Sequence, residues 1–135
     1  MISVKKVAVI GAGTMGAGIA QVSARAGYEV VLFDIQEKAL LLAEAGINRN
    51  LDTAIEKGKA ATEEKASTLA KIQFTSDFSA LKADLIIEAI IEKLDVKREL
   101  MQKLAAQNPS HTILASNTSS IPITQIAAAV PNPER

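Results

Sequence analysis

The sequence predicts an α/β protein built on a doubly wound parallel sheet with helices on both faces. An apolar, β-branched run at residues 5–10 ends in a Gly-x-Gly-x-x-Gly turn that opens into a helical segment. Four further apolar runs follow, separated by segments with helical periodicity, and this alternation is typical of parallel sheets. The strand order expected for such a sheet is 3-2-1-4-5.

Length and composition restrict the class of protein. The 135 residues fit a single domain over residues 1–135. Fifteen basic and fifteen acidic side chains cancel, so neither nucleic acid nor an anionic membrane is an expected partner. The lack of cysteine excludes disulfides and thiolate chemistry, which agrees with a cytoplasmic location. No apolar run reaches the ~18 residues of a spanning helix, and no metal site is expected.

The glycine turn after residues 5–10 has the spacing of a Rossmann-type dinucleotide site. Gly11 permits the tight turn, Gly13 lets a pyrophosphate approach the backbone, and Gly16 lets the helix pack closely on the strand. The helix N-terminus offers unpaired N–H groups and a positive dipole end to phosphates. The alternative is a glycine turn in an unrelated α/β domain. We predict that the helix ends at Gly27.

Helical spacing predicts which face of this first helix is buried. Met15, Ile19, Val22 and Ala26 recur at intervals of three or four residues and form its expected buried stripe.

The second apolar run, residues 29–33, ends at Asp34, which stands 18 residues after Gly16. At this position a carboxylate can accept hydrogen bonds from the adenosine ribose hydroxyls. It would repel a 2′-phosphate, and no arginine follows to neutralise one, so NAD is favoured over NADP. The alternative role for Asp34 is the N-cap of the next helix, and the two roles can coexist.

A helical hairpin is predicted after the second strand. Its first helix spans residues 36–57 and is followed by Gly58, and its second helix begins with Thr62 as the cap and reaches about residue 71. This insertion is longer than a crossover requires. Asn50, Lys57 and Lys59 point to an anionic ligand, although surface lysines are commonly only solvated.

Two further strands are predicted at 72–75 and 84–90, and the second contains a carboxylate, Glu88. A carboxylate there is unfavourable unless it is paired or lies near the exposed strand end. Glu92 follows the strand, on the side where open α/β sheets bind ligands. A helix over 93–107 is expected to bury Val96 among its apolar positions.

The last predicted strand, 112–115, is followed by five small polar residues, 116–120. Ser119 or Ser120 can cap the next helix, expected to reach about residue 130, and the remaining side chains can bind a polar ligand. His111 precedes the strand at the opposite end of the sheet and is expected to lie on the surface. The strand itself is expected to form an open sheet edge.

Together these segments resemble the NAD-binding domain of the 3-hydroxyacyl-CoA dehydrogenases, including the central part of the multifunctional fatty-acid oxidation proteins. Three motifs carry the resemblance: Gly-Ala-Gly-Thr-Met-Gly-Ala-Gly-Ile-Ala at 11–20, Ile-Glu-Ala-Ile-Ile-Glu at 87–92 and Ala-Ser-Asn-Thr-Ser-Ser at 115–120. The resemblance covers essentially the whole chain. It implies NAD as cofactor, an acyl-CoA as substrate and a place in fatty-acid β-oxidation.

The resemblance also implies roles for individual residues. Ser119 would orient the substrate's 3-oxygen, supported by Asn117, while Asn50 and Lys57 would contact CoA. Met15 would touch the adenosine half of NAD. The cofactor contacts implied as a set are Gly11, Gly13, Thr14, Met15, Gly16, Asp34, Ile91, Glu92, Lys97, Asn117 and Ser119.

The family's general base is a histidine in a Gly-x-His-Phe-Phe-Asn-Pro segment, which this sequence does not contain. The family's helical domain for substrate binding and dimerisation is absent too. We therefore expect an N-terminal fragment that binds NAD but does not by itself oxidise (S)-3-hydroxyacyl-CoA to 3-ketoacyl-CoA; the parent enzyme would be a homodimer. The alternatives are a non-catalytic NAD-sensing module and a related dehydrogenase of small 2- or 3-hydroxyacids.

Overall fold

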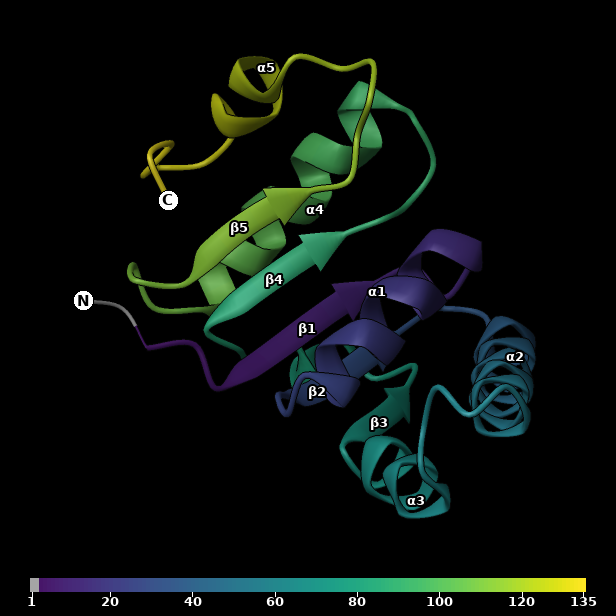
Figure 1. The fold of residues 1–135 in the computed structure, drawn as a ribbon. Coiled ribbons are helices and arrows are strands. Elements are labelled where there is room, and N and C mark those ends of the chain that lie inside the picture. Colours follow the sequence, from purple (N-terminus) through teal and green to yellow (C-terminus); the bar gives the residue numbers. More distant parts are fainter. Residues whose placement is uncertain (1–2) are drawn as a thin grey trace.

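A computed structural model describes residues 3–135 and contains one five-stranded parallel sheet in the order β3-β2-β1-β4-β5 (Figure 1). Fold class and strand order are therefore as predicted. The strands are β1 (Lys6–Ile10), β2 (Glu29–Phe33), β3 (Ile72–Thr75), β4 (Leu85–Glu88) and β5 (Ile113–Ser116). The helices are α1 (Thr14–Arg25), α2 (Glu37–Glu56), α3 (Thr62–Ala70), the 3₁₀ turn η1 (Phe78–Ala80), α4 (Leu94–Gln107) and α5 (Ile123–Ala127).

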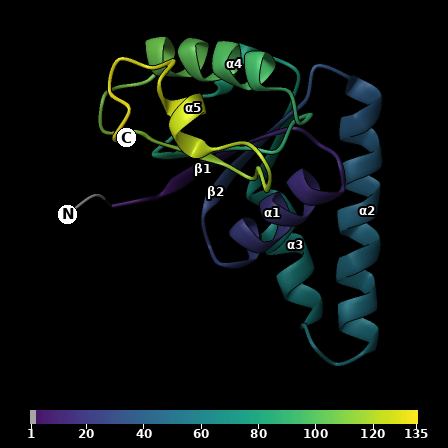
Figure 2. The same ribbon diagram turned by 90° about the horizontal axis from the view of Figure 1, so that it is seen from above.

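The sheet lies between two helical layers, with α1, α2 and α3 on one side and α4 and α5 on the other (Figure 2). Because side chains alternate along a strand, each strand contributes to both cores. In β1, Val7 and Val9 pack towards α1 and α2, whereas Ala8 and Ile10 pack towards α4 and α5. Burial on both faces explains why the strands are almost continuously apolar.

The buried face of α1 differs from the prediction. The residues against the sheet are the small ones, Gly16, Ala20 and Ala24, whereas Met15 and Val22 are 58% and 63% exposed. A Cβ on Gly16 would stand 1.6 Å from the Gly11 carbonyl oxygen, so the helix approaches the turn too closely for large side chains. The predicted stripe was wrong at Met15, Val22 and Ala26, because it followed hydrophobicity alone, whereas Ile19 is half-buried and packs against the core as predicted.

Glycines end both α1 and α2. Gly27 and Gly58 have φ angles of 103° and 67°, in the left-handed region that favours glycine. Each N–H bonds back into the last turn, and so does the N–H of the residue after it, in the Schellman arrangement. The predicted ends at these glycines are confirmed. Helix α3 begins one residue earlier than predicted, because its N-cap is Ala61 and not Thr62; the Ala61 N–H donates to Glu64 Oε1 at 3.2 Å.

Several elements are shorter or shifted relative to the prediction. Strand β4 ends at Glu88 rather than residue 90, because the Ile90 N–H turns back to the Glu88 carboxylate at 3.1 Å. Helix α5 ends at Ala127 rather than residue 130, and its N-cap is Pro122 without a side-chain bond. The expected cap at Ser119 or Ser120 was therefore wrong.

The outer edge of β5 is partly covered, not open as expected. The Leu114 N–H donates to the Arg135 carbonyl at 2.9 Å. The Arg135 side chain donates to the Thr112 and Pro109 carbonyls at 3.1 and 2.7 Å. The bond to Leu114 satisfies a backbone group that an edge strand otherwise presents to solvent, and the side-chain bonds hold Arg135 against the segment before β5.

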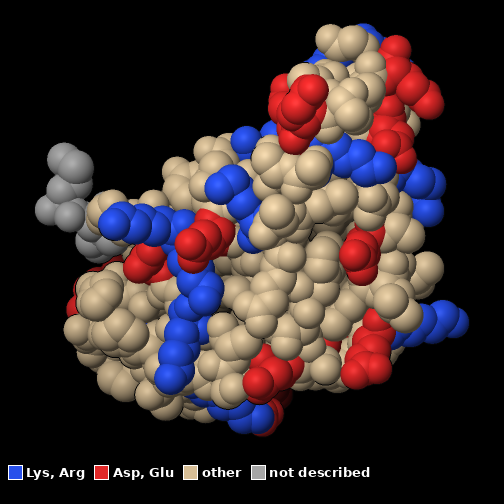
Figure 3. Space-filling view, turned by 90° about the horizontal axis from the view of Figure 1, so that it is seen from below, with Lys and Arg blue, Asp and Glu red and all other residues tan. Residues whose placement is uncertain are grey.

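The α2–α3 hairpin projects beyond the sheet layers (Figure 2). Figure 3 shows acidic and basic side chains interspersed over one face of the molecule, as the cancelling charges of the sequence suggest. None of the helices within residues 3–135 combines the length and apolar character needed to cross a bilayer.

Candidate functional site

A cavity of about 770 Å³ opens at the carboxyl end of the sheet. Its lining comes from the glycine turn, the end of β2, the segment after β3, the loop after β4 and one side of α4. Strands β1 and β4 are neighbours here, although their connections run to opposite sides of the sheet. This is the topological switch point at which doubly wound folds bind their ligands.

The glycine turn forms the floor of this cavity with Gly11 and Gly13. Gly11 has a φ of 102°, and a Cβ there would stand 2.5 Å from the Ala89 carbonyl oxygen, so no other residue fits without rearrangement. At Gly13 nothing lies within 4 Å of a Cβ position, which leaves the backbone open to a ligand. Gly13 caps α1 without any side-chain bond, so the first N–H groups of α1 can bind an anion.

Asp34 follows β2 and faces the same cavity. One carboxylate oxygen accepts from the Ala12 N–H and the other from the Gln36 N–H, both at 2.9 Å. The side chain therefore ties the glycine turn to the start of α2 and retains lone pairs for a ligand hydroxyl. Asp34 is not the N-cap of α2, since that position belongs to Gln36.

Apolar side chains line the cavity beyond Asp34. Phe33 and Phe78 meet edge to face, with ring centroids 5.8 Å apart. Ile35, Val96 and Leu100 complete these walls, and Val96 is 40% exposed rather than buried as predicted. An apolar slot beside a fixed carboxylate and an amide-lined turn fits the base, ribose and phosphates of a nucleotide.

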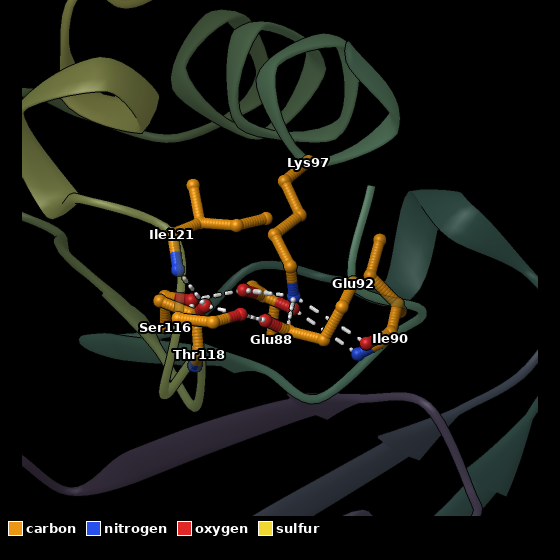
Figure 4. A network of polar contacts seen from close by, with 8 residues as sticks. Glu88, Ile90, Glu92, Lys97, Ser116, Thr118 and Ile121 are labelled. Carbon is orange, nitrogen blue, oxygen red and sulfur yellow. Dashed lines mark hydrogen bonds and ion pairs between the residues drawn. The ribbon is translucent and has the colours of Figure 1, made fainter. Parts of the chain in front are cut away.

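A buried ion pair lies beside the cavity, between β4 and α4 (Figure 4). Lys97 Nζ is 2.8 Å from both carboxylate oxygens of Glu88 and 3.0 Å from Glu92 Oε1, and it donates more weakly to the Ile90 carbonyl at 3.4 Å. Glu88 and Lys97 are both 0% exposed. This ion pair explains how a carboxylate can lie within an apolar strand, where the sequence predicted that it would need a partner. Removing one partner of such a pair costs about 3–5 kcal/mol.

Glu92 is the solvent-facing member of this group. Its Oε2 accepts from the Thr118 and Ser120 hydroxyls at 2.7 and 2.9 Å. The Thr118 hydroxyl, the Lys97 ammonium and the Ser120 hydroxyl hold the pKa of Glu92 below its ordinary value, against a small opposing effect of burial. Glu92 is therefore a firmly ionised hydrogen-bond acceptor at neutral pH.

The polar cluster after β5 divides into two sets. Ser116, Thr118 and Ser120 bind the protein's own carboxylates, with Ser116 donating to Glu88 through a short hydrogen bond. Asn117 and Ser119 alternate with them and are exposed. The sequence did not lead us to predict that Ser116, Thr118 and Ser120 bind these carboxylates. The signal for it was Glu88, because a carboxylate within an apolar strand needs partners.

The structure brings some predicted site residues together and leaves others apart. Gly11, Gly13, Asp34 and Ile91 line one cavity, and Glu92 and Lys97 belong to the ion-pair group next to it. Thr14, Met15 and Gly16 form the first turn of α1, where Met15 is exposed.

Two other predicted residues lie on the hairpin, away from the cavity. Asn50 is exposed on α2 and donates to Gln21 Oε1 on α1 at 3.2 Å, and Lys57 is exposed at the C-cap of α2. His111 is exposed before the amino end of β5, whereas the polar cluster follows its carboxyl end.

Comparison with known proteins gives consistent matches over the whole chain. Residues 6–135 match the family model described as the NAD-binding domain of 3-hydroxyacyl-CoA dehydrogenase. The 3-hydroxyadipyl-CoA dehydrogenase of Escherichia coli (strain K12) is 49% identical over 136 residues, which cover 100% of this chain and 29% of that protein. The probable 3-hydroxybutyryl-CoA dehydrogenase of Bacillus subtilis (strain 168) is 44% identical, with 98% and 46% covered.

Solved structures agree with these matches. The crystal structure of 3-hydroxybutyryl-CoA dehydrogenase from Escherichia coli K12 superposes with a TM-score of 0.95 at 48% identity, covering 98% of this chain and 28% of that one. The chain thus spans less than half the length of these relatives.

Proposed function

Because this chain belongs to the 3-hydroxyacyl-CoA dehydrogenase family, as its NAD-binding domain, we propose that the whole protein oxidises a 3-hydroxyacyl-CoA to the 3-ketoacyl-CoA. The reaction removes a proton from the 3-hydroxyl and a hydride from C3, and NAD supplies the hydride acceptor. The main support is the joint placement of the glycine turn and Asp34 at one cavity, beside the firmly ionised Glu92.

Within this proposal, the chain's own residues bind and orient. The amide groups at the start of α1 bind the pyrophosphate, with Thr14, Met15 and Gly16 in that first turn. Asp34 accepts from the adenosine ribose. Glu92 accepts from the ribose at the nicotinamide end, next to Ile91, and Lys97 acts from behind through its ion pair with Glu92. Ser119, supported by Asn117, donates to the substrate's 3-oxygen from the loop after β5.

Proton removal is proposed to need a histidine that this sequence does not supply. His111 is the one histidine of the chain, and strand β5 separates it from the carboxyl edge of the sheet. The test is a titration of the 135-residue chain with NADH, followed by addition of acetoacetyl-CoA. We expect NADH to bind and its 340-nm absorbance to stay constant. Turnover would contradict the assignment of the base, and failure to bind NADH would contradict the site.

Asn50 and Lys57 are proposed to contact the CoA moiety. Asn50 lies on α2 and Lys57 is its C-cap, seven residues further on, which is about 10 Å along a helix and nearly the same face. For Lys57→Ala we expect a loss of CoA affinity of about two- to fivefold, the size of an exposed ion pair. Lys71→Ala is the matched control, since Lys71 is an exposed lysine at the C-cap of α3 and does not belong to the residues predicted to bind an anion. Equal losses in both variants would show only a general charge effect.

A further inference from the structure

Glu88 is the buried ionisable group to which the proposed function gives no role. It ends β4 at the carboxyl edge of the sheet, one strand away from the glycine turn, and is 0% exposed. A buried carboxylate is unfavourable in an apolar strand, so its partners show what it supports. Those partners are Lys97 on α4, Ser116 at the end of β5 and the Ile90 N–H in the loop after β4.

The hydrogen bonds of this group have a defined direction. The Thr118 N–H donates to Ser116 Oγ at 3.1 Å, so the Ser116 hydroxyl is free to donate to Glu88. In the same way the Ile121 N–H donates to Thr118 Oγ1 at 3.1 Å, and the Thr118 hydroxyl donates to Glu92. Glu88 and Glu92 therefore both anchor the loop after β5 (Figure 4).

The charges of the group are unequally shared. Two carboxylates face one ammonium, which leaves one net negative charge. Lys97 lies 2.8 Å from both oxygens of Glu88 but contacts only one oxygen of Glu92, at 3.0 Å. Because Lys97 pairs mainly with Glu88, the Glu92 carboxylate keeps its negative charge and has lone pairs on its solvent-facing side.

We propose that Glu88 is a positioning residue for cofactor binding: it holds Lys97 back from Glu92 and anchors the loop after β5, so that Glu92 stays available to the ribose at the nicotinamide end. This inference rests on the proposed function, which assigns Glu92 to that ribose. Without the Glu88 charge, Lys97 would pair fully with Glu92, and the acceptor for the ribose hydroxyls would be neutralised.

The test compares two ligands by calorimetry on the 135-residue chain. NADH reaches both halves of the site, whereas ADP lacks the nicotinamide and its ribose. For Glu88→Gln we expect about tenfold weaker binding of NADH, the size of a charge-assisted hydrogen bond, and unchanged binding of ADP. A parallel loss of both affinities would reveal a merely structural role and overturn the proposal, as would unchanged NADH binding.

Two further measurements make the result independent of folding problems. In a Glu92→Gln background, Glu88→Gln should cause no additional loss of NADH affinity, because the residue acts through Glu92; an additive loss would overturn the proposal. The double variant Glu88→Leu/Lys97→Met replaces the buried pair by apolar side chains, an exchange that is often neutral for stability. Because it also removes the lysine that would neutralise Glu92, this variant should bind ADP normally and keep most of the NADH affinity that Glu88→Gln loses. A loss as large as that of Glu88→Gln would overturn the proposal.

Binding by the wild-type chain distinguishes a failure of the role proposed for Glu92 from a failure of the inference about Glu88. If the wild-type chain binds ADP but gains nothing from the rest of NADH, the proposed role of Glu92 fails, and that of Glu88 fails with it. If the wild type gains affinity from the nicotinamide half and Glu88→Gln keeps that gain, only the inference about Glu88 is overturned.

Discussion

At Gly16, one added carbon atom decides whether the first helix can lie against the glycine turn. A Cβ there would overlap the Gly11 carbonyl oxygen, which is backbone and cannot rotate away. Gly18, one half-turn further along the same helix, has nothing within 4 Å of its Cβ position. Two glycines of one motif thus have different physical roles, and only the first is required by packing.

This difference predicts opposite effects of the same substitution. Gly16→Ala should lower the free energy of unfolding by about 3 kcal/mol or more, because overpacking forces the backbone apart. Gly18→Ala should raise it by about 0.5–1 kcal/mol, because alanine loses less entropy in a helix. Urea denaturation of both variants beside the wild type provides the measurement. Equal destabilisation would contradict the close packing at Gly16.

Replacing Asp34 should weaken cofactor binding directly. Asp34→Ala removes the acceptor proposed for the adenosine ribose, so NADH binding should weaken by about 1.5–3 kcal/mol, which is roughly 10- to 150-fold. The measurement is a fluorescence titration with NADH. Circular dichroism must show an intact fold, since Asp34 also accepts from Ala12 and Gln36. An unchanged dissociation constant would refute the ribose assignment.

At the scale of the elements, carboxylates join segments that are distant in the sequence. Glu88 and Glu92 tie the loop after β4 to the loop after β5 at the carboxyl end of the sheet. Asp84 has the corresponding place at the amino end, where one of its oxygens accepts from the Lys5 and Lys6 N–H groups at 2.8 and 2.9 Å. The start of β1 is thereby fixed to the start of β4.

The hydrogen bonds to Asp84 should make the stability of the fold depend on pH. The backbone bonds from Lys5 and then Lys6 lower the pKa of Asp84 from its ordinary value of 3.8, against an opposing effect of burial. Because folding lowers this pKa, the stabilisation is complete above pH 3.8 and is lost as the pH falls through the folded value. Unfolding free energies measured from pH 7 to pH 2.5 should fall less steeply below pH 4 in Asp84→Asn than in the wild type.

The exposed Glu44 provides the control for that series. Glu44→Gln should follow the wild-type curve over the whole range. A wild-type slope in the Asp84→Asn variant would mean that Asp84 does not contribute to acid sensitivity.

At the scale of the whole molecule, one sheet carries both the core and the site. Its two faces are covered by helices, and its carboxyl edge forms the cavity between the glycine turn and the loop after β4. A ligand bound there contacts both halves of the sheet. Binding should therefore stabilise the whole fold and not one loop alone.

Thermal unfolding measures this coupling. At a concentration one hundred times its dissociation constant, NADH should stabilise the fold by about 2.7 kcal/mol, which corresponds to a rise in Tm of roughly 5–15 °C. NADPH at the same concentration should have a much smaller effect, because the Asp34 carboxylate repels its 2′-phosphate. Equal shifts with both nucleotides would contradict the preference for NAD.

Much of the fold could be predicted from the sequence, because the signals involved are local. The bounds of β2 and β3, the helix ends at Gly27 and Gly58, and the strand order all follow from periodicity and glycine placement. The buried face of α1 did not follow, since hydrophobicity favoured Met15 and Val22. The close approach of α1 to the sheet decided which face is buried, and the spacing of apolar residues in the sequence does not show how closely a helix will pack.

The site divides in the same way. By itself the sequence determined a glycine turn at a strand end and an acid closing the second strand, because both belong to one continuous motif. It also showed that Glu88 needed a partner. Only the tertiary structure decided that this partner is Lys97 and that Ser116, Thr118 and Ser120 serve the two carboxylates. Those contacts span 9 to 28 residues of sequence, and packing of neighbouring strands and helices brings them together.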